Sequence, residues 1–337
     1  MSELTGDGLE IPRFTDVLQA RRRLRSHLDP TPLRHYRGLS DLTGAETWVK
    51  HENFQPTGAF KVRGGINLVS QLSDDERRRG VISASTGNHG QSIAYAARLF
   101  GVAATICAPA GANRVKVAAM EELGARVILH GADFDEAREH CEALARREGH
   151  RYVHSANEPL LIAGVATHTL EALEARPELE VIIVPVGGGS GASGACIAAN
   201  AVNPAIEVIA VQSAQAPAAR IAWREGHMGP AASTTFAEGM ATRVAFDLPQ
   251  RILRERLDDF VLVDDDEIRS AVALMVEHTR TLVEAAGAAP LAALLKLRER
   301  LRGRRVALIC SGGNISPEQL RDVLGWRLPD ARPAKAG

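Results

Sequence analysis

The chain of 337 residues is 45% hydrophobic with a formal net charge of -1 at pH 7, which suits one large α/β core or two joined ones. This balance gives no electrostatic reason to expect a nucleic-acid or membrane partner, and no apolar run approaches the roughly 20 residues of a membrane span. The first residues lack a secretion-signal pattern, and the 4 cysteines lack metal or disulfide spacing. We therefore expect a reduced, soluble, cytoplasmic protein.

Short apolar runs alternate with helical patterns along most of the chain. Buried strands are predicted at residues 81–84, 103–108, 126–129, 181–186, 207–211 and 305–310. Apolar residues recur every three or four positions at about 88–100, 113–123, 133–148, 159–174, 191–201, 265–279 and 287–301, which predicts helices there. This alternation predicts an α/β fold with mostly parallel sheets flanked by helices.

Residues 80–155 follow the order strand, helix, strand, helix, strand, helix, strand. This predicts a small domain, residues 70–157, inserted into a large domain made of residues 1–69 and 158–328. The acidic run from Asp264 to Glu267 precedes a predicted helix. We favour helix capping over a metal cluster for this run, because acidic side chains satisfy the free amides of a helix start.

The environment of Lys61 is unusual for a lysine, which by default is exposed. Phe60 gives it an apolar flank, while Gly58 and the pair Gly64 and Gly65 permit close backbone approach. Thr57 is placed to cap the helix that follows. Burial of a lysine favours its neutral amine, which is a nucleophile capable of forming a Schiff base.

Gly187 to Gly191 follow an apolar strand and precede a helix, as in phosphate-binding loops. Residues 189–194 also satisfy G-x-G-x-x-G, so a dinucleotide site and a purely structural turn are alternatives. The next strand ends at Gln212 without the carboxylate that a dinucleotide ribose requires. A phosphate cradle is the better interpretation, and with a Schiff-base lysine it indicates pyridoxal 5'-phosphate.

Residues 52–65, ENFQPTGAFKVRGG, resemble the lysine motif of the threonine/serine dehydratase and serine racemase family, the fold-type II pyridoxal-phosphate enzymes. Residues 85–91, 185–191, 237–239 and 311–314 follow in the family's order, so the resemblance covers nearly the whole chain. It implies a two-domain, tryptophan-synthase-β-like architecture, a cofactor held by the large domain, a mobile small domain and a homodimer.

The resemblance also implies roles for individual residues. Lys61 would hold the cofactor as a Schiff base and act in catalysis, Phe60 would pack on the ring, and Asn88 would bind the ring hydroxyl. Ser311 would face the ring nitrogen, where a hydroxyl favours β-elimination over transamination. The implied cofactor-binding residues are Phe60, Lys61, Asn88, Gly187, Gly188, Gly189, Ser190, Gly191, Gly239, Glu284 and Ser311. The implied substrate-binding residues are Ser85, Thr86, Asn88 and His89, on the loop that would take the substrate carboxylate.

Four positions set this chain apart. Family members that need a divalent cation have two carboxylates where this chain has Gln212 and Ala218, so we expect no metal there. Thr86 stands where racemases use a serine as acid or base, and either a packing role or proton transfer is open to it. Arg243 is either an exposed arginine or a ligand for the distal group of an acidic substrate.

The expected function is that of a lyase in amino-acid catabolism. It would be an ammonia-lyase, or dehydratase, that converts a β-hydroxy α-amino acid such as L-threonine or L-serine to a 2-oxo acid and ammonia. Alternatives are an amino-acid racemase that uses Thr86, and a dehydratase for a rarer substrate such as 3-hydroxyaspartate or a hydroxyectoine derivative. A cofactor-binding protein without enzymatic activity is a further alternative.

Overall fold

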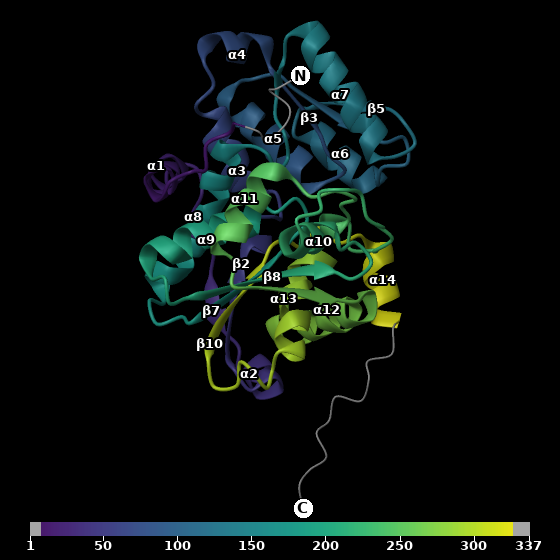
Figure 1. Ribbon diagram of the computed structural model, residues 1–337. Helices are drawn as coiled ribbons and strands as arrows, with labels where there is room; N and C mark the ends of the chain where they lie inside the picture. Colours follow the sequence, from purple (N-terminus) through teal and green to yellow (C-terminus); the bar gives the residue numbers. More distant parts are fainter. Residues whose placement is uncertain (1–7, 326–337) are drawn as a thin grey trace, which may run out of the picture.

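The computed structural model describes residues 8–325 and contains two separate β-sheets (Figure 1). The larger sheet has the strand order β1-β2-β10-β7-β8-β9. β1 is antiparallel to β2, and the other neighbouring pairs are parallel. Its strands are β1 (Leu33–His35), β2 (Glu46–His51), β7 (Val181–Pro185), β8 (Glu207–Ser213), β9 (Asp259–Val263) and β10 (Arg305–Cys310).

Helices separate most of the strands and cover the sheets. They are α1 (Phe14–Leu24), α2 (Arg37–Thr43), α3 (Lys61–Val69), α4 (Asp74–Arg79), α5 (Asn88–Phe100), α6 (Arg114–Glu122), α7 (Phe134–Glu148), α8 (Pro159–Ala175), α9 (Ser190–Val202), α10 (Ala218–Glu225), α11 (Asp247–Arg256), α12 (Asp265–Thr279), α13 (Ala285–Lys296) and α14 (Pro317–Gly325). Two short 3-10 helices are η1 (Glu52–Phe54) and η2 (Glu238–Met240). No helix in the described part of the chain is long and apolar enough to cross a membrane.

The central strands of the larger sheet are buried on both faces. In β7, Val181 and Ile183 belong to one core cluster, while Ile182 and Val184 belong to another. Because successive side chains of a strand point to opposite faces, an unbroken apolar run fits a strand covered on both sides. Helices α12 and α13 cover the first face, and α8, α9 and α11 cover the second.

The smaller sheet lies in the upper part of Figure 1 and is parallel throughout, with the order β5-β4-β3-β6. Its strands are β3 (Val81–Ala84), β4 (Ala104–Ala108), β5 (Arg126–Leu129) and β6 (Arg151–Tyr152). Its core continues into the rest of the molecule, because Val62 and Ile66 of α3 pack in the same cluster as Val81 and Ile93. The mobility and boundaries of the small domain stay a prediction. Residues 1–7 and 326–328 of the predicted large domain lie outside the described residues.

The predicted α/β class and the six predicted strands are confirmed, each strand to within two residues. The predicted helices are also confirmed except at 287–301, where α13 spans Ala285–Lys296. Leu301 is buried and keeps the apolar spacing, but it lies in a turn beyond the helix. The prediction missed β2 because its last residues, Lys50 and His51, are polar although both are buried.

The parallel strands place several loops at one edge of the larger sheet. β10 lies between β2 and β7 and runs parallel to both, so the loops after these three strands emerge side by side. They begin at Glu52, Val186 and Ser311. Ligand sites of open α/β sheets form at this carboxyl edge. Ser85 follows β3 of the smaller sheet in the same way.

Candidate active site

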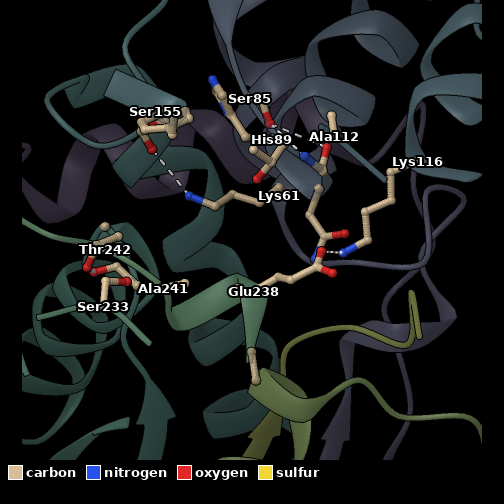
Figure 2. Close-up of a pocket in the computed structure, with 18 of the residues that line it drawn as sticks. Lys61, Ser85, His89, Ala112, Lys116, Ser155, Ser233, Glu238, Ala241 and Thr242 are labelled. Carbon is tan, nitrogen blue, oxygen red and sulfur yellow. Dashed lines mark hydrogen bonds and ion pairs between the residues drawn. The ribbon is translucent and has the colours of Figure 1, made fainter. Parts of the chain in front are cut away.

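One cavity of about 760 Å³ lies where loops of the two sheets meet (Figure 2). Every candidate site residue named from the sequence lines it. Loops and helix starts after β3 of the smaller sheet contribute Ser85, Thr86, Asn88 and His89. The rest of the molecule contributes Phe60, Lys61, Gly187, Gly188, Gly189, Ser190, Gly191, Gly239, Arg243, Glu284 and Ser311. The structure therefore brings together residues as far apart in sequence as Phe60 and Ser311.

Lys61 is the first residue of α3, and its amine points into the cavity (Figure 2). The Nζ atom donates to the Ser190 hydroxyl at 2.8 Å and to the Ser155 carbonyl at 3.2 Å. Burial lowers the pKa of Lys61 to about 8, because the enclosed ammonium loses hydration. Roughly a tenth of the amine is then neutral at pH 7, far more than for an ordinary lysine, in the direction that the sequence predicted for a nucleophilic lysine.

The turn before Lys61 differs from the predicted one in its capping. Phe60, not Thr57, is the N-cap of α3, and no side chain caps that helix start. The Thr57 hydroxyl instead donates to the Ala59 carbonyl at 3.4 Å. Gly58 has φ +65°, and a Cβ there would lie 2.5 Å from Oδ1 of Asn314, so glycine is required for both conformation and space.

The glycine loop connects β7 to α9, with Gly189 as the N-cap at φ +93°. A Cβ on Gly187 would overlap the Gly239 carbonyl, and one on Gly191 would lie 3.2 Å from the Phe60 ring. The loop therefore leaves no room for a side chain at Gly187 and little at Gly191. A helix start with free amides beside a buried serine hydroxyl and a lysine amine fits the phosphate of the expected cofactor.

A chain of hydrogen-bonded polar groups lies at another part of the cavity, where the ring would lie. Asn88 donates to Oε1 of Glu284 at 2.8 Å, and Asn314 donates to Asn88 Oδ1 at 2.8 Å and to the Thr57 carbonyl at 2.9 Å. Burial raises the pKa of Glu284 to about 7. Ser311 is buried beside this chain, directly after β10. These groups fit a heteroaromatic ring with hydrogen-bonding edges.

The loop from Ser85 to His89 leads into α5. The Ser85 hydroxyl accepts hydrogen bonds from the amides of Gly87 at 3.1 Å and Gly90 at 2.8 Å. It therefore shapes the loop as well as lining the cavity. His89 is buried with Nε2 2.8 Å from the Ser83 hydroxyl, while its Nδ1 atom has no partner among the described residues. Burial and the nearby Lys61 lower the pKa of His89 to about 3, so this ring is neutral.

Two ion pairs connect the two walls of the cavity, and the sequence did not predict either. Lys116 of α6 pairs with Glu238 of η2, as Figure 2 shows. Arg243 pairs with Asp133 at 3.2 Å and lies 4.0 Å from Asp135. The Arg243 side chain is 58% exposed, so it is both a surface arginine and a residue of the cavity rim.

Further cavity residues escaped the sequence prediction. Arg138 lies on α7 and pairs with Glu142 four residues later at 2.8 Å, a spacing typical of a solvated helix face. Glu238 belongs to a motif that the sequence singled out, so the signal for it was present. Lys116 lies on α6, a helix that the sequence predicted, but nothing in the local sequence marks this lysine as a cavity residue.

The positions relevant to metal binding have other partners. Gln212 is buried and accepts from the Arg220 amide at 3.1 Å, and Ala218 begins α10. The predicted capping role of the acidic run is confirmed: Asp264 accepts from the Glu267 amide at 2.8 Å, and Glu267 accepts from the Asp264 amide at 2.7 Å. Among residues 8–325, no group of three or more His, Cys, Asp or Glu side chains is placed to hold a metal ion.

Comparisons with known proteins agree with this geometry. Residues 24–312 match the family model described as "Pyridoxal-phosphate dependent enzyme". The chain is 38% identical over 310 residues to an L-threonine ammonia-lyase of Thermotoga maritima, covering 92% of this chain and 77% of that protein. It is 35% identical over 320 residues to an L-threo-3-hydroxyaspartate ammonia-lyase of Saccharomyces cerevisiae, covering 94% and 98%.

Among solved structures, maize serine racemase superposes with a TM-score of 0.89 at 30% identity, over 94% of this chain and 98% of that one. The fold-type II architecture and the pyridoxal-phosphate cofactor predicted from the sequence are thereby confirmed. The chain belongs to the pyridoxal-phosphate dependent enzyme family.

Proposed function

We propose that this protein is a pyridoxal-phosphate dependent ammonia-lyase that converts a β-hydroxy α-amino acid, such as L-threonine or L-serine, to a 2-oxo acid and ammonia. The observation that carries the proposal is the Lys61 amine, with a lowered pKa of about 8, in one cavity with the glycine loop and Ser311. The similarity to an L-threonine ammonia-lyase over 92% of the chain supports the same reaction class.

When bound, pyridoxal phosphate supplies an electron sink for the negative charge that develops at the substrate Cα. Lys61 holds the cofactor between turnovers and removes the α-proton, a step that its lowered pKa favours near neutral pH. The amides of the glycine loop and the Ser190 hydroxyl bind the phosphate. Phe60 packs against the same loop and supports the ring.

Ser311 is proposed to hydrogen-bond the ring nitrogen, with Asn88 at the ring hydroxyl and Gly239 and Glu284 against the ring edge. A serine hydroxyl does not keep the nitrogen protonated as a carboxylate does. The weaker electron sink favours loss of the β-hydroxyl over transamination. Gly312 keeps this wall close, because a Cβ there would lie 2.5 Å from Oε1 of Glu284.

The substrate carboxylate is proposed to bind the loop of Ser85, Thr86, Asn88 and His89. The loop offers backbone amides at the start of α5, and the unpartnered Nδ1 of His89 is an additional polar contact. His89 stays neutral over the whole working range because its pKa is about 3. The loop therefore binds an anion by hydrogen bonds rather than by a charged imidazole.

A Lys61→Ala variant tests this proposal directly. It is expected to form no 2-oxo acid from L-threonine or L-serine and to lose the visible absorption of cofactor bound to lysine. Thr57→Ala is the control, because within residues 8–325 its hydroxyl donates to the Ala59 carbonyl, outside the proposed chemistry, and its loss is expected to preserve turnover. A Lys61→Ala protein with full turnover would refute the mechanism.

Arg243 supports a second substrate class, the acidic β-hydroxy amino acids such as 3-hydroxyaspartate. Its guanidinium lies at the cavity rim beside Asp133 and is more than half exposed, so it is accessible to a distal carboxylate. The similarity to an L-threo-3-hydroxyaspartate ammonia-lyase supports this substrate class. Arg243→Ala should lower kcat/KM for 3-hydroxyaspartate far more than for L-serine, and equal losses would exclude the contact.

Racemisation is the alternative outcome at the same cofactor, and Thr86 is the residue that would carry it. Its side chain lines the cavity and is half-buried. Chiral analysis of serine recovered from a partial reaction distinguishes the two outcomes. Racemisation would be established if the wild type forms D-serine and Thr86→Val does not.

We further propose a cytoplasmic homodimer that needs no metal at Gln212 and Ala218. The exposed Phe54 and Leu282 support an interface between copies, because Asn53 hydrogen-bonds the Leu282 carbonyl and holds these two apolar residues in one region. Sedimentation of the wild type and of Phe54→Glu tests this assembly. Activity after chelation, with and without added magnesium, tests the expectation about the metal.

A further inference from the structure

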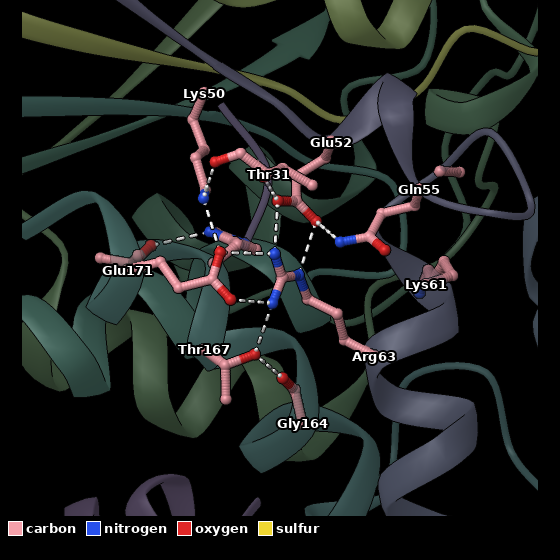
Figure 3. Close-up of polar contacts among 12 residues, drawn as sticks. Thr31, Lys50, Glu52, Gln55, Lys61, Arg63, Gly164, Thr167 and Glu171 are labelled. Carbon is pink, nitrogen blue, oxygen red and sulfur yellow. Dashed lines mark hydrogen bonds and ion pairs between the residues drawn. The ribbon is translucent and has the colours of Figure 1, made fainter. Parts of the chain in front are cut away.

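A buried cluster of four charged side chains lies beside α3, the helix that begins with Lys61 (Figure 3). Its members are Lys50, Glu52, Arg63 and Glu171. Arg63 forms a two-point ion pair with Glu52, with Nε to Oε2 at 2.7 Å and Nη2 to Oε1 at 2.9 Å. It forms a second one with Glu171, at 2.6 and 2.7 Å. Lys50 also contacts Glu171, at 2.6 Å. The two positive and two negative charges balance.

Three of these four side chains are almost completely removed from water, and that of Glu171 is 13% exposed. The side chains of Arg63 and Lys50 are each 1% exposed and that of Glu52 is 0% exposed. Burial alone would raise the pKa of Glu52, but Arg63 outweighs it and lowers that pKa to about 2. Glu52 is therefore ionised at every working pH. Buried ion pairs seldom stabilise a fold more than apolar residues would, so their geometry is the property to explain.

The position of Glu52 and Arg63 in the chain suggests that explanation. Glu52 directly follows β2, and Arg63 lies in the first turn of α3, so their pair closes the two ends of the loop that presents Lys61. An arginine fork paired at two points with a carboxylate fixes orientation as well as distance. Because Arg63 is also held by Glu171 of α8, this closure is anchored to the body of the molecule.

The middle of the same loop is fixed separately. Phe60 donates its amide to the Ser311 carbonyl at 3.0 Å, and Gly313 donates to the Gly58 carbonyl at 2.9 Å. The backbone of the loop is thus tied to the wall that holds Ser311. The Glu52–Arg63 pair adds control over the direction in which α3 leaves the loop, and hence over the direction of the Lys61 side chain.

We propose that Glu52 and Arg63 are positioning residues that aim the Lys61 amine at the cofactor aldehyde. The inference rests on the proposed role of Lys61 and adds how the amine is directed. In the covalent step the neutral amine adds to the aldehyde carbon, a carbon–nitrogen double bond replaces the carbon–oxygen double bond, and the oxygen leaves as water with the two hydrogens of the amine. A misdirected amine makes formation of this bond less favourable without changing the contacts to the phosphate and the ring.

Two ligands separate the direction of the amine from the shape of the cavity. Pyridoxal 5'-phosphate bonds to Lys61, whereas pyridoxine 5'-phosphate carries an alcohol in place of the aldehyde and binds only by contacts. The measured quantity is the ratio of their dissociation constants for cofactor-free protein, obtained by titration or competition. Arg63→Lys keeps the charge but loses the fork, and it should reduce the preference for the aldehyde about tenfold, the size of one charge-assisted hydrogen bond. Affinity for the alcohol should stay unchanged.

Lys50→Met is the matched control, since Lys50 is equally buried and also pairs with Glu171 but lies outside the loop. It should lower the melting temperature and leave the ratio unchanged. Lys61→Ala should abolish the preference altogether. A preference that survives there would refute the proposed role of Lys61 and the positioning role with it, whereas an unchanged ratio in Arg63→Lys alone would refute only the positioning role.

Glu52→Gln provides a second variant if Arg63→Lys does not fold, because Arg63 then keeps Glu171 as its partner. It should lower the preference for the aldehyde by a similar factor. Equal weakening of both ligands, or an unchanged ratio in a folded variant, would overturn the positioning role.

Discussion

The two walls of the cavity are built in different ways. On the larger-sheet side, the glycine loop, Lys61 and Ser311 are held by backbone contacts, and glycines permit approaches that no side chain would tolerate. On the smaller-sheet side, charged side chains dominate the rim, including Lys116, Asp133 and Arg138. The first wall binds the cofactor, whose shape is constant. Residues of the second wall can be replaced to suit another substrate with little loss of stability.

This contrast predicts that substitutions on the first wall are far more damaging. Gly187→Ala should have the largest effect, because the new Cβ would overlap the Gly239 carbonyl, which is backbone and cannot rotate away. We expect affinity for pyridoxal phosphate to fall about a hundredfold, as for an overpacked site. Gly325→Ala, with nothing within 4 Å of its Cβ, is the control. Cofactor titration of both variants checks this, and wild-type affinity in Gly187→Ala would show that the loop yields.

Lys61, on the first wall, should lower the free energy of unfolding as long as its side chain carries a proton. Its pKa is about 8 in the folded protein against 10.5 for the free side chain, so the unfolded state binds more protons between pH 8 and 10.5. The free energy of unfolding of cofactor-free protein should therefore rise with pH across that window. Lys61→Met should remove this rise and stabilise the protein at pH 7 by about 3 kcal/mol.

Chemical denaturation of both proteins at pH 7, 8, 9 and 10 measures this effect. The difference between wild type and Lys61→Met should shrink as pH approaches 10.5. A constant difference would mean that Lys61 is not desolvated in the folded protein.

The ion pair between Lys116 and Glu238 should act on substrate binding more than on the chemical step. It joins α6 to η2 across the cavity, so its loss loosens one wall relative to the other. For Lys116→Met we expect KM to rise about fivefold with kcat nearly unchanged, equivalent to about 1 kcal/mol. Arg147→Met, which breaks an exposed pair with Glu148, is the control. A large fall in kcat at constant KM would instead make Lys116 catalytic.

The two walls also differ in how far the sequence predicts them. The glycine loop and the turn at Lys61 depend on short contiguous motifs whose chemistry is local, and both line the cavity, although Phe60 and not the predicted Thr57 is the N-cap of α3. Lys116 and Asp133 reach the cavity only because the smaller sheet faces the larger one, a relation that no local pattern encodes. Arg63 stands inside the recognised motif, but its partner Glu171 is 108 residues away, so the buried cluster was invisible.

The smallest expected effect lies at the rim and sharpens the choice of substrate. Asp133 holds Arg243 at 3.2 Å and also caps α7, accepting the Glu136 amide at 3.0 Å. Asp133→Asn keeps an oxygen for the cap but releases the guanidinium, so stability should change by less than about 1 kcal/mol. The ratio of kcat/KM for 3-hydroxyaspartate over L-serine should rise two- to threefold, roughly the value of one exposed ion pair. Asp135→Asn, at 4.0 Å from Arg243, should change that ratio less. An unchanged or lower ratio in Asp133→Asn would mean that Arg243 does not bind the distal carboxylate, and that the rim selects substrates by shape alone.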